Sequence, residues 1–115
     1  MEKINEQVEI ILNAIDDKGG QETVTLDVGE QTSIADYFVI TSGSSSTQVS
    51  AIADEVEKQM DLKGYERINR SGYSSARWVL LDYGNVIVHV FHKEERQYYD
   101  LERLWESVEN IKEDN

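Results

Sequence analysis

The sequence contains no cysteine and no proline, and it has no long apolar run. Without cysteine the chain forms no disulfide, which favours a reducing compartment. Without proline, and with only seven scattered glycines, no linker divides the 115 residues. No apolar run approaches the roughly 20 residues of a membrane span, and the first ten residues lack the pattern of a signal peptide. We therefore expect one soluble, cytoplasmic domain over residues 1–115 whose last few residues fray.

Basic residues are also scarce. Eleven lysines and arginines stand against 23 aspartates and glutamates, so the formal net charge is −12. This field repels phosphate backbones, so direct nucleic-acid binding is not expected, whereas a basic protein would be attracted. A solvated acidic surface that aids solubility is the simpler explanation. Residues 64–91 are the exception, because two acidic and three basic residues give them a charge of +1, and aromatic and aliphatic residues are frequent there.

Three segments have the hydrophobic spacing of helices. The first is carried by apolar residues within 4–15, and the glycine pair at 19–20 is expected to end it in the left-handed conformation. The second buries a stripe within 49–60 and ends at Gly64. The third is expected over 95–111, with its apolar face directed inward.

Five strands are expected between these helices. The second strand is almost continuously apolar, which is typical of a central strand covered on both faces. The helix that follows it acts as a crossover, so part of the sheet should be parallel, while a hairpin turn at 82–85 makes another part antiparallel. We therefore expect an α/β (α+β) fold with a mixed, roughly five-stranded sheet flanked by helices. The expected strands are 24–28, 34–41, 66–70, 77–82 and 86–91.

The stretch TSGSSS at 41–46 leaves the second strand and raises the question of a phosphate site. A P-loop needs a lysine at a fixed offset, and none lies between Lys18 and Lys58. A nucleotidyltransferase-type site needs clustered acidic residues for magnesium close to this turn, and no acidic residue follows Gly43-Ser44 until Asp54. Ser45 and Gln48 instead fit a capping box, so we expect the stretch to begin a helix. An enzyme that transfers a nucleotide through Gly43-Ser44 is the rival hypothesis.

His89 and His92 are the only histidines, and their spacing in a strand places them on opposite faces. They form a poor metal pair, and no metal or other cofactor is expected. We expect His89 to be a partly buried, hydrogen-bonded residue rather than a catalytic base. Asp82, across the hairpin, could hydrogen-bond it.

The strand WVLLD at 78–82 carries bulky apolar groups on both faces. Val79 and Leu81 point one way, while Trp78, Leu80 and Asp82 point the other. Either helices cover both faces, or one face docks a partner. Because Trp is a frequent interface anchor, core packing and docking are balanced alternatives here.

These residues also carry a resemblance. The pattern ADYFVITSGS at 35–44, followed by Gly72, WVLLD at 78–82, VHVF at 88–91 and RQYYDLERLW at 96–105, closely resembles the ribosomal silencing factor (RsfS, or Iojap-like) family. The motifs occur in the order typical of the family and span nearly the whole chain. The resemblance implies a nucleotidyltransferase-like fold without a working active site, and therefore a protein that is not an enzyme.

The resemblance also implies a partner and a mode of action. Members bind the large-subunit ribosomal protein L-fourteen, block the joining of the two ribosomal subunits and repress translation when nutrients are limiting. A role in large-subunit assembly through the same surface is an alternative. The resemblance further implies a homodimer when free. The residues that it implies at or near the docking surface are Gly72, Trp78, Leu80, Asp82, His89, Arg96 and Tyr99.

Overall fold

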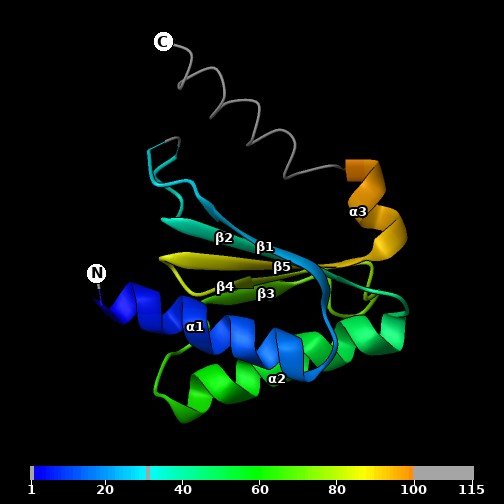
Figure 1. The fold of residues 1–115 in the computed structure, drawn as a ribbon, viewed down its shortest axis with the longest axis horizontal. Helices are drawn as coiled ribbons and strands as arrows, with labels where there is room; N and C mark the ends of the chain where they lie inside the picture. The colour runs from blue at the N-terminus through cyan, green and yellow to red at the C-terminus, as the bar shows by residue number, and fades with distance from the viewer. Residues whose placement is uncertain (1, 31, 100–115) are drawn as a thin grey trace.

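The computed structural model describes residues 2–30 and 32–99. Within them, two long helices lie on one face of a five-stranded sheet, and a short helix lies on the opposite side (Figure 1). In chain order the elements are α1 (Glu2–Asp17), β1 (Gln21–Asp27), β2 (Tyr37–Gly43), α2 (Ser46–Leu62), β3 (Asn69–Ser71), β4 (Trp78–Asp82), β5 (Val86–His92) and α3 (Lys93–Tyr99).

Both long helices end as the glycines predict. Gly19 has φ +73°, and the amide of Gly20 donates to the carbonyl of Ile15 at 2.9 Å. Gly64 has φ +84°, and the amide of Tyr65 donates to the carbonyl of Met60 at 2.9 Å. Each glycine adopts the left-handed conformation while the next amide reaches back five residues, so the last carbonyls of both helices are hydrogen-bonded.

The strand order is β1-β2-β5-β4-β3. Strands β2 and β5 pair in parallel, with Val39 opposite Val88, and the other three pairs are antiparallel. The prediction of a mixed sheet with a parallel part is confirmed. The two parallel strands occupy the interior of the sheet, and nearly every residue in them is buried.

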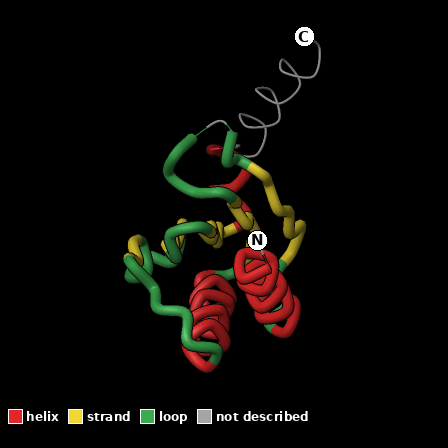
Figure 2. The backbone as a smooth tube through the Cα atoms, turned by 90° about the vertical axis from the view of Figure 1, so that its left-hand side faces the viewer, coloured by secondary structure: helices red, strands yellow, loops and turns green. Residues whose placement is uncertain are grey.

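The sheet separates two apolar clusters. On one face, the α2 stripe Val49, Ile52, Ala53, Val56 and Met60 packs with α1 and with alternate residues of β2, β4 and β5. Figure 2 shows α1 and α2 side by side against this face. The other face carries a second cluster, formed by Val28, Ala35, Phe38, Ile40, Ile87 and Phe91 with Trp78 and Leu80 against it. Both faces of the sheet are therefore apolar.

Several predicted boundaries are wrong by a few residues. The first strand starts at Gln21 rather than 24, the second runs over 37–43 rather than 34–41, and the third is only 69–71 rather than 66–70. The last helix begins at Lys93 rather than 95, and its predicted continuation to 111 lies outside the described residues. Residues 34–36 leave the strand because the backbone amides of Asp36 and Tyr37 both donate to the carbonyl of Asn85, at 2.8 and 3.1 Å. None of the described helices is long and apolar enough to cross a membrane.

Candidate docking surface

Strand β4 divides its side chains between the two faces of the sheet. Val79 and Leu81 are fully buried against the helices. Trp78, Leu80 and Asp82 lie on the opposite face and are partly exposed. The alternation predicted for this strand is confirmed, and the two long helices cover only one of its faces. The other face presents a line of two apolar groups and a carboxylate, which we call the β4 line.

Aromatic rings of β2 and β5 pack against Trp78, the first residue of the β4 line. The indole of Trp78 stacks on the ring of Phe91, with 4.8 Å between centroids and 28° between planes. The ring of Phe38 meets His89 edge-on at 4.9 Å. Offset stacking and edge-to-face contacts are the favourable arrangements of aromatic pairs. The indole of Trp78 is therefore packed against Phe91 of β5.

His89 is buried, with 4% of its surface exposed. Its Nδ1 accepts a hydrogen bond from Nε1–H of Trp78 at 3.1 Å. An imidazole nitrogen that accepts is unprotonated, so the proton of a neutral ring is on Nε2. Burial lowers the pKa of His89 to about 4, so the ring is neutral at pH 7. The predicted buried, hydrogen-bonded histidine is confirmed, and Trp78 is its partner.

Asp82 does not serve as the partner of His89. In the β4–β5 ladder His89 stands opposite Leu80, whereas Asp82 stands opposite Ile87 at the end of the strand. Oδ1 of Asp82 accepts the backbone amide of Gly84 at 2.8 Å. The hydrogen bond that Asp82 could have made to His89 is therefore not formed, because the antiparallel register places Asp82 two positions along the ladder from the residue opposite His89. Asp82 instead braces the hairpin turn.

Gly72 acts through the backbone. It has φ +78°, and a Cβ built there would lie 2.0 Å from the carbonyl oxygen of Trp78. Only glycine fits both the left-handed conformation and this close approach. Ala76, in the same connection between β3 and β4, also has positive φ, +54°. Gly72 therefore shapes the chain that leads into Trp78.

Arg96 is 8% exposed and belongs to the packing of α3. Its Nη1 donates to the carbonyl of Gln21 at 3.2 Å and to Oγ of Ser42 at 3.3 Å. These bonds hold α3 to the ends of β1 and β2. Tyr99 lies at the end of α3, but its side chain is outside the described residues. The structure thus groups Trp78, Leu80, Asp82, His89 and Gly72 around β4. The bonds of Arg96 to Gln21 and Ser42 join α3 to β1 and β2.

The TSGSSS turn begins a helix, as predicted. Oγ of Ser45 accepts the amide of Gln48 at 3.1 Å, which is the N-cap half of the capping box. The reciprocal half differs from the expected box, because Oε1 of Gln48 accepts from the amide of Ser44 at 2.7 Å. Nε2 of Gln48 donates to the carbonyls of Lys18 and Gly19 at 3.2 and 2.9 Å. The turn therefore joins the start of α2 to the end of α1.

The described residues offer no group of three or more His, Asp or Glu side chains that could hold a metal ion. Asp54, the first acid after the turn, accepts a hydrogen bond from the hydroxyl of Tyr73 at 2.8 Å. What the structure shows at the TSGSSS turn is the helix cap that the sequence predicts.

The comparisons with known proteins decide the family. A family model described as "Ribosomal silencing factor during starvation" (RsfS) matches residues 1–115. The chain belongs to the ribosomal silencing factor family. A relative named ribosomal silencing factor RsfS, from Halalkalibacterium halodurans, is 48% identical over 100 residues, which cover 87% of this chain and 86% of the relative.

Solved structures and more distant relatives extend the family. A crystal structure of a protein from Chromobacterium violaceum superposes with a TM-score of 0.87 at 34% identity, covering 89% of this chain and 85% of that chain. A mouse protein named "Mitochondrial assembly of ribosomal large subunit protein 1" is 23% identical over 101 residues, which cover 85% of this chain and 44% of that protein. The family therefore includes silencing factors and is related to a large-subunit assembly protein.

The family resemblance in the sequence missed Arg77, which adjoins the β4 line. Its guanidinium donates to Glu95 at 2.7 Å and to Glu94 at 3.2 Å, and these hydrogen bonds raise its pKa. The pairs fix the start of α3 beside Trp78. The Glu94-Glu95 pair after a strand was a usable signal, because acidic residues favour the first turn of a helix. Their partner, however, is 17 and 18 residues away in the sequence.

Proposed function

We propose that this chain is a non-enzymatic silencing factor that binds the large ribosomal subunit through protein L-fourteen and keeps the small subunit from joining. Membership of the ribosomal silencing factor family is the observation that carries the proposal. Translation would be repressed while the factor is bound, under nutrient limitation or in stationary phase. The site of action would be the cytoplasm.

The β4 line supplies a surface that suits this role. Trp78 and Leu80 are partly exposed apolar groups, and Trp is enriched among residues that dominate binding energy. Oδ1 of Asp82 accepts a hydrogen bond from Gly84 within the hairpin. A carboxylate can accept further hydrogen bonds, so Asp82 could also bind a lysine or arginine of the partner. We propose that Trp78, Leu80 and Asp82 contact L-fourteen, while Gly72 and His89 shape the strand. Arg96 and Tyr99 would hold the helix beside them.

Charge supports the same partner class. The net charge of −12 would speed the encounter with a basic ribosomal protein, while residues 64–91 carry only +1 and can be desolvated at lower cost. Contact with nucleic acid is not needed for this mode of binding. We propose that residues 1–115 act as one RsfS-type domain, nucleotidyltransferase-like without a working active site, and form a homodimer when free.

A subunit-joining assay tests the proposal. Purified large subunits are incubated with the protein, small subunits are added, and whole ribosomes are separated on a sucrose gradient. We expect fewer whole ribosomes and co-migration of the protein with large subunits alone. Trp78→Ala and Asp82→Lys should abolish both effects. Glu9→Lys, an equal charge reversal on α1, is the matched control and should retain them. If the subunits join as before and the protein does not co-migrate with large subunits, the proposed silencing function is overturned.

Large-subunit assembly is the second candidate, and the name of the mouse relative favours it. It would use the same surface at an earlier stage. Depleting the protein from cells separates the two functions, because an assembly factor leaves large-subunit precursors behind. A silencing factor leaves mature large subunits that join too readily.

A further inference from the structure

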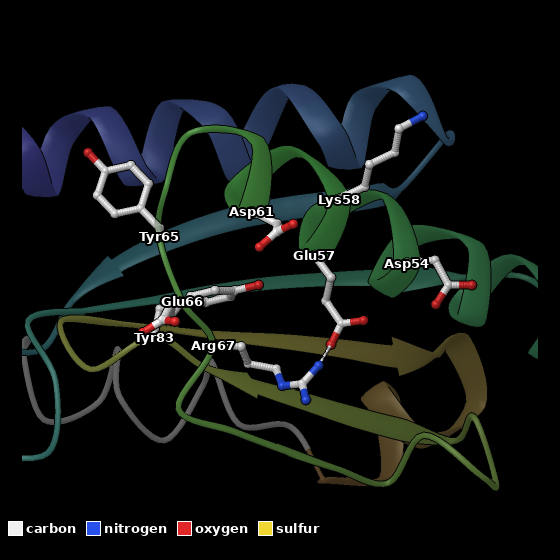
Figure 3. A pocket seen from close by; sticks show the side chains of 8 residues that line it. All are labelled: Asp54, Glu57, Lys58, Asp61, Tyr65, Glu66, Arg67 and Tyr83. Carbon is white, nitrogen blue, oxygen red and sulfur yellow. Dashed lines mark hydrogen bonds and ion pairs between the residues drawn. The ribbon is translucent and has the colours of Figure 1, made fainter.

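The hollow on the helix side of the sheet is a solvated surface of mixed charge. It has a volume of about 490 Å³ and is lined by residues of α2 and of the segment that follows α2 (Figure 3). Glu57 in its wall is paired with Arg67 and Arg70, and the exposed Lys58 also lines it. We assign this hollow no ligand. A polar group that lacks a partner lies instead on the opposite face of the sheet.

The imidazole of His89 has one nitrogen without a hydrogen-bond partner in the described chain. Its Nδ1 accepts from Nε1–H of Trp78, so the proton of the neutral ring is on Nε2. Nε2 is buried and meets no acceptor within residues 2–30 and 32–99. Only one other side-chain atom in that part of the chain is in this state, Oε1 of Gln7 on α1. Buried polar groups are normally paired, so Nε2–H indicates a partner that these residues do not supply.

The side chains around the ring are apolar. Phe38 meets the imidazole edge-on at 4.9 Å, and the ring of Phe91 lies 6.3 Å away between centroids. Leu80 stands opposite His89 in the β4–β5 ladder, and Ile40 stands opposite it in the parallel pair with β2. An unpaired donor is costly in such surroundings, and a hydrogen bond formed there is stronger than one in water.

Nε2 lies close behind the proposed docking surface. A side chain on a strand stands roughly perpendicular to the sheet, and Nε2 is one bond farther from Cβ than Nδ1. Nε2 therefore extends away from the backbone, on the same side of the sheet as the β4 line. Trp78 and Leu80, two of the three residues of that line, adjoin His89 and are partly exposed. Side chains commonly change rotamer when proteins associate, so a partner seated on the β4 line can bring an atom to Nε2.

We propose that the docked partner presents an oxygen atom to Nε2–H of His89. The inference rests on the proposed function, because the partner is the protein that seats on the β4 line. An oxygen of a backbone carbonyl or a polar side chain completes the hydrogen bonds of the imidazole. A competitor with an apolar group at that point leaves the donor buried and unpaired, which weakens its binding. His89 therefore contributes specificity, whereas Trp78 and Leu80 contribute buried apolar area.

The imidazole resonances of His89 test the proposal in the unaltered chain. The full chain is prepared with isotopically labelled histidine and mixed with purified L-fourteen, and the Nε2–H signal is followed by NMR. We expect this proton to move downfield on binding, because a hydrogen-bonded N–H proton is deshielded. His92 shares strand β5 but lies on its other face, where Nδ1 accepts the amide of Glu94. Its ring is the internal control and should not shift.

The outcomes distinguish this inference from the proposed function. If backbone amides of β4 shift while Nε2–H of His89 does not, L-fourteen docks on the β4 line without presenting an acceptor, and the inference is overturned. If no resonance shifts, the proposed function fails and the inference falls with it. A signal that is already downfield in the free chain and exchanges magnetisation with water identifies a buried water molecule as the partner, which also overturns the inference.

Two amide substitutions separate recognition of the partner from support of Trp78. His89→Asn places its amide near the position of Nδ1, whereas His89→Gln carries an N–H donor to the position of Nε2. We expect binding to large subunits, measured by co-sedimentation, to be about tenfold weaker in His89→Asn and within about threefold of the wild type in His89→Gln. If His89 only held the indole, the order would be reversed, because Asn keeps an acceptor for Nε1–H. A reversed order or equal binding overturns the proposal, and urea unfolding checks that both variants are folded.

Discussion

Nε1–H of Trp78 donates a hydrogen bond to Nδ1 of His89, 3.1 Å away across the β4–β5 pair. The bond fixes the orientation of the indole and the tautomer of the imidazole together. The residue proposed as the main anchor of the docking surface is therefore held by a neutral, buried histidine. Protonation of that histidine would place two donors against each other and break the bond.

This relationship predicts a dependence of stability on pH. The pKa of His89 is about 4 in the folded chain and 6.5 in an ordinary histidine, so the unfolded chain binds the proton first as the pH falls. The contribution of neutral His89 is complete above pH 6.5 and is lost towards pH 4, by about 3 kcal/mol in total. Urea unfolding of the wild type and of His89→Phe at each pH measures it. The stability difference should change by that amount, and parallel curves would contradict the prediction.

Gly72 and Gly64 offer a matched pair of substitutions. Gly72→Ala should lower the free energy of unfolding by about 2–4 kcal/mol, because the new Cβ meets the Trp78 carbonyl in addition to adopting the left-handed conformation. Gly64→Ala should cost about 1 kcal/mol, since its Cβ would meet nothing within 4 Å. Denaturant titration of both variants compares them. Equal losses would show that backbone conformation alone decides both positions.

Gln48 should stabilise the end of α1 as well as the start of α2. Gln48→Glu keeps an acceptor for Ser44 but removes the donor to the carbonyls of Lys18 and Gly19, at a cost of about 1–2 kcal/mol. Ser45→Ala, which removes only the N-cap, should cost about 1 kcal/mol. Hydrogen exchange distinguishes them: the amide of Gly20 should exchange faster in Gln48→Glu alone.

The two partners of Arg77 should differ in strength. Glu95 pairs at 2.7 Å with 24% of its side chain exposed, whereas Glu94 pairs at 3.2 Å with 68% exposed. A double-mutant cycle of Arg77→Ala with Glu95→Ala should therefore give a larger coupling than the cycle with Glu94→Ala, because exposed pairs are weakened by solvent. Added salt should reduce both couplings. A larger coupling to Glu94 would contradict the geometry.

The capped turn should not bind nucleotides. The amide of Ser44 already donates to Gln48, and the described residues lack a metal cluster nearby. A nucleoside triphosphate with magnesium should therefore leave the melting temperature unchanged. A ligand at 100 times its dissociation constant would stabilise the fold by about 2.7 kcal/mol, which is readily detected as a shift. Such a shift would restore the enzyme hypothesis.

Local patterns predicted the elements well and their boundaries less well. The α2 stripe, the glycines that end both helices and the hairpin at 82–85 are all confirmed, because each depends on residues close in sequence. The start of β2 was wrong, since Asn85 binds the amides of residues 36 and 37 from another part of the chain. No pattern within residues 34–41 contains that contact.

The site was predicted in the same uneven way. Alternation in β4 correctly separated Val79 and Leu81 from the β4 line. It could not decide that His89 bonds to Trp78 rather than Asp82, because that depends on the register of two strands. Family resemblance implies that Arg96 lies at or near the docking surface, and this stays a prediction. What no local pattern contained is that its guanidinium donates to the carbonyl of Gln21 and to Ser42.

The sequence by itself determined the family, the acidic charge, the succession of helices and strands and the cap that begins α2. These follow from residue types and short spacings. Tertiary structure alone decided which face of β4 stays partly exposed and which partner His89 takes. The physical reason is that burial and pairing depend on which distant segments meet, and strand register and helix packing set those meetings.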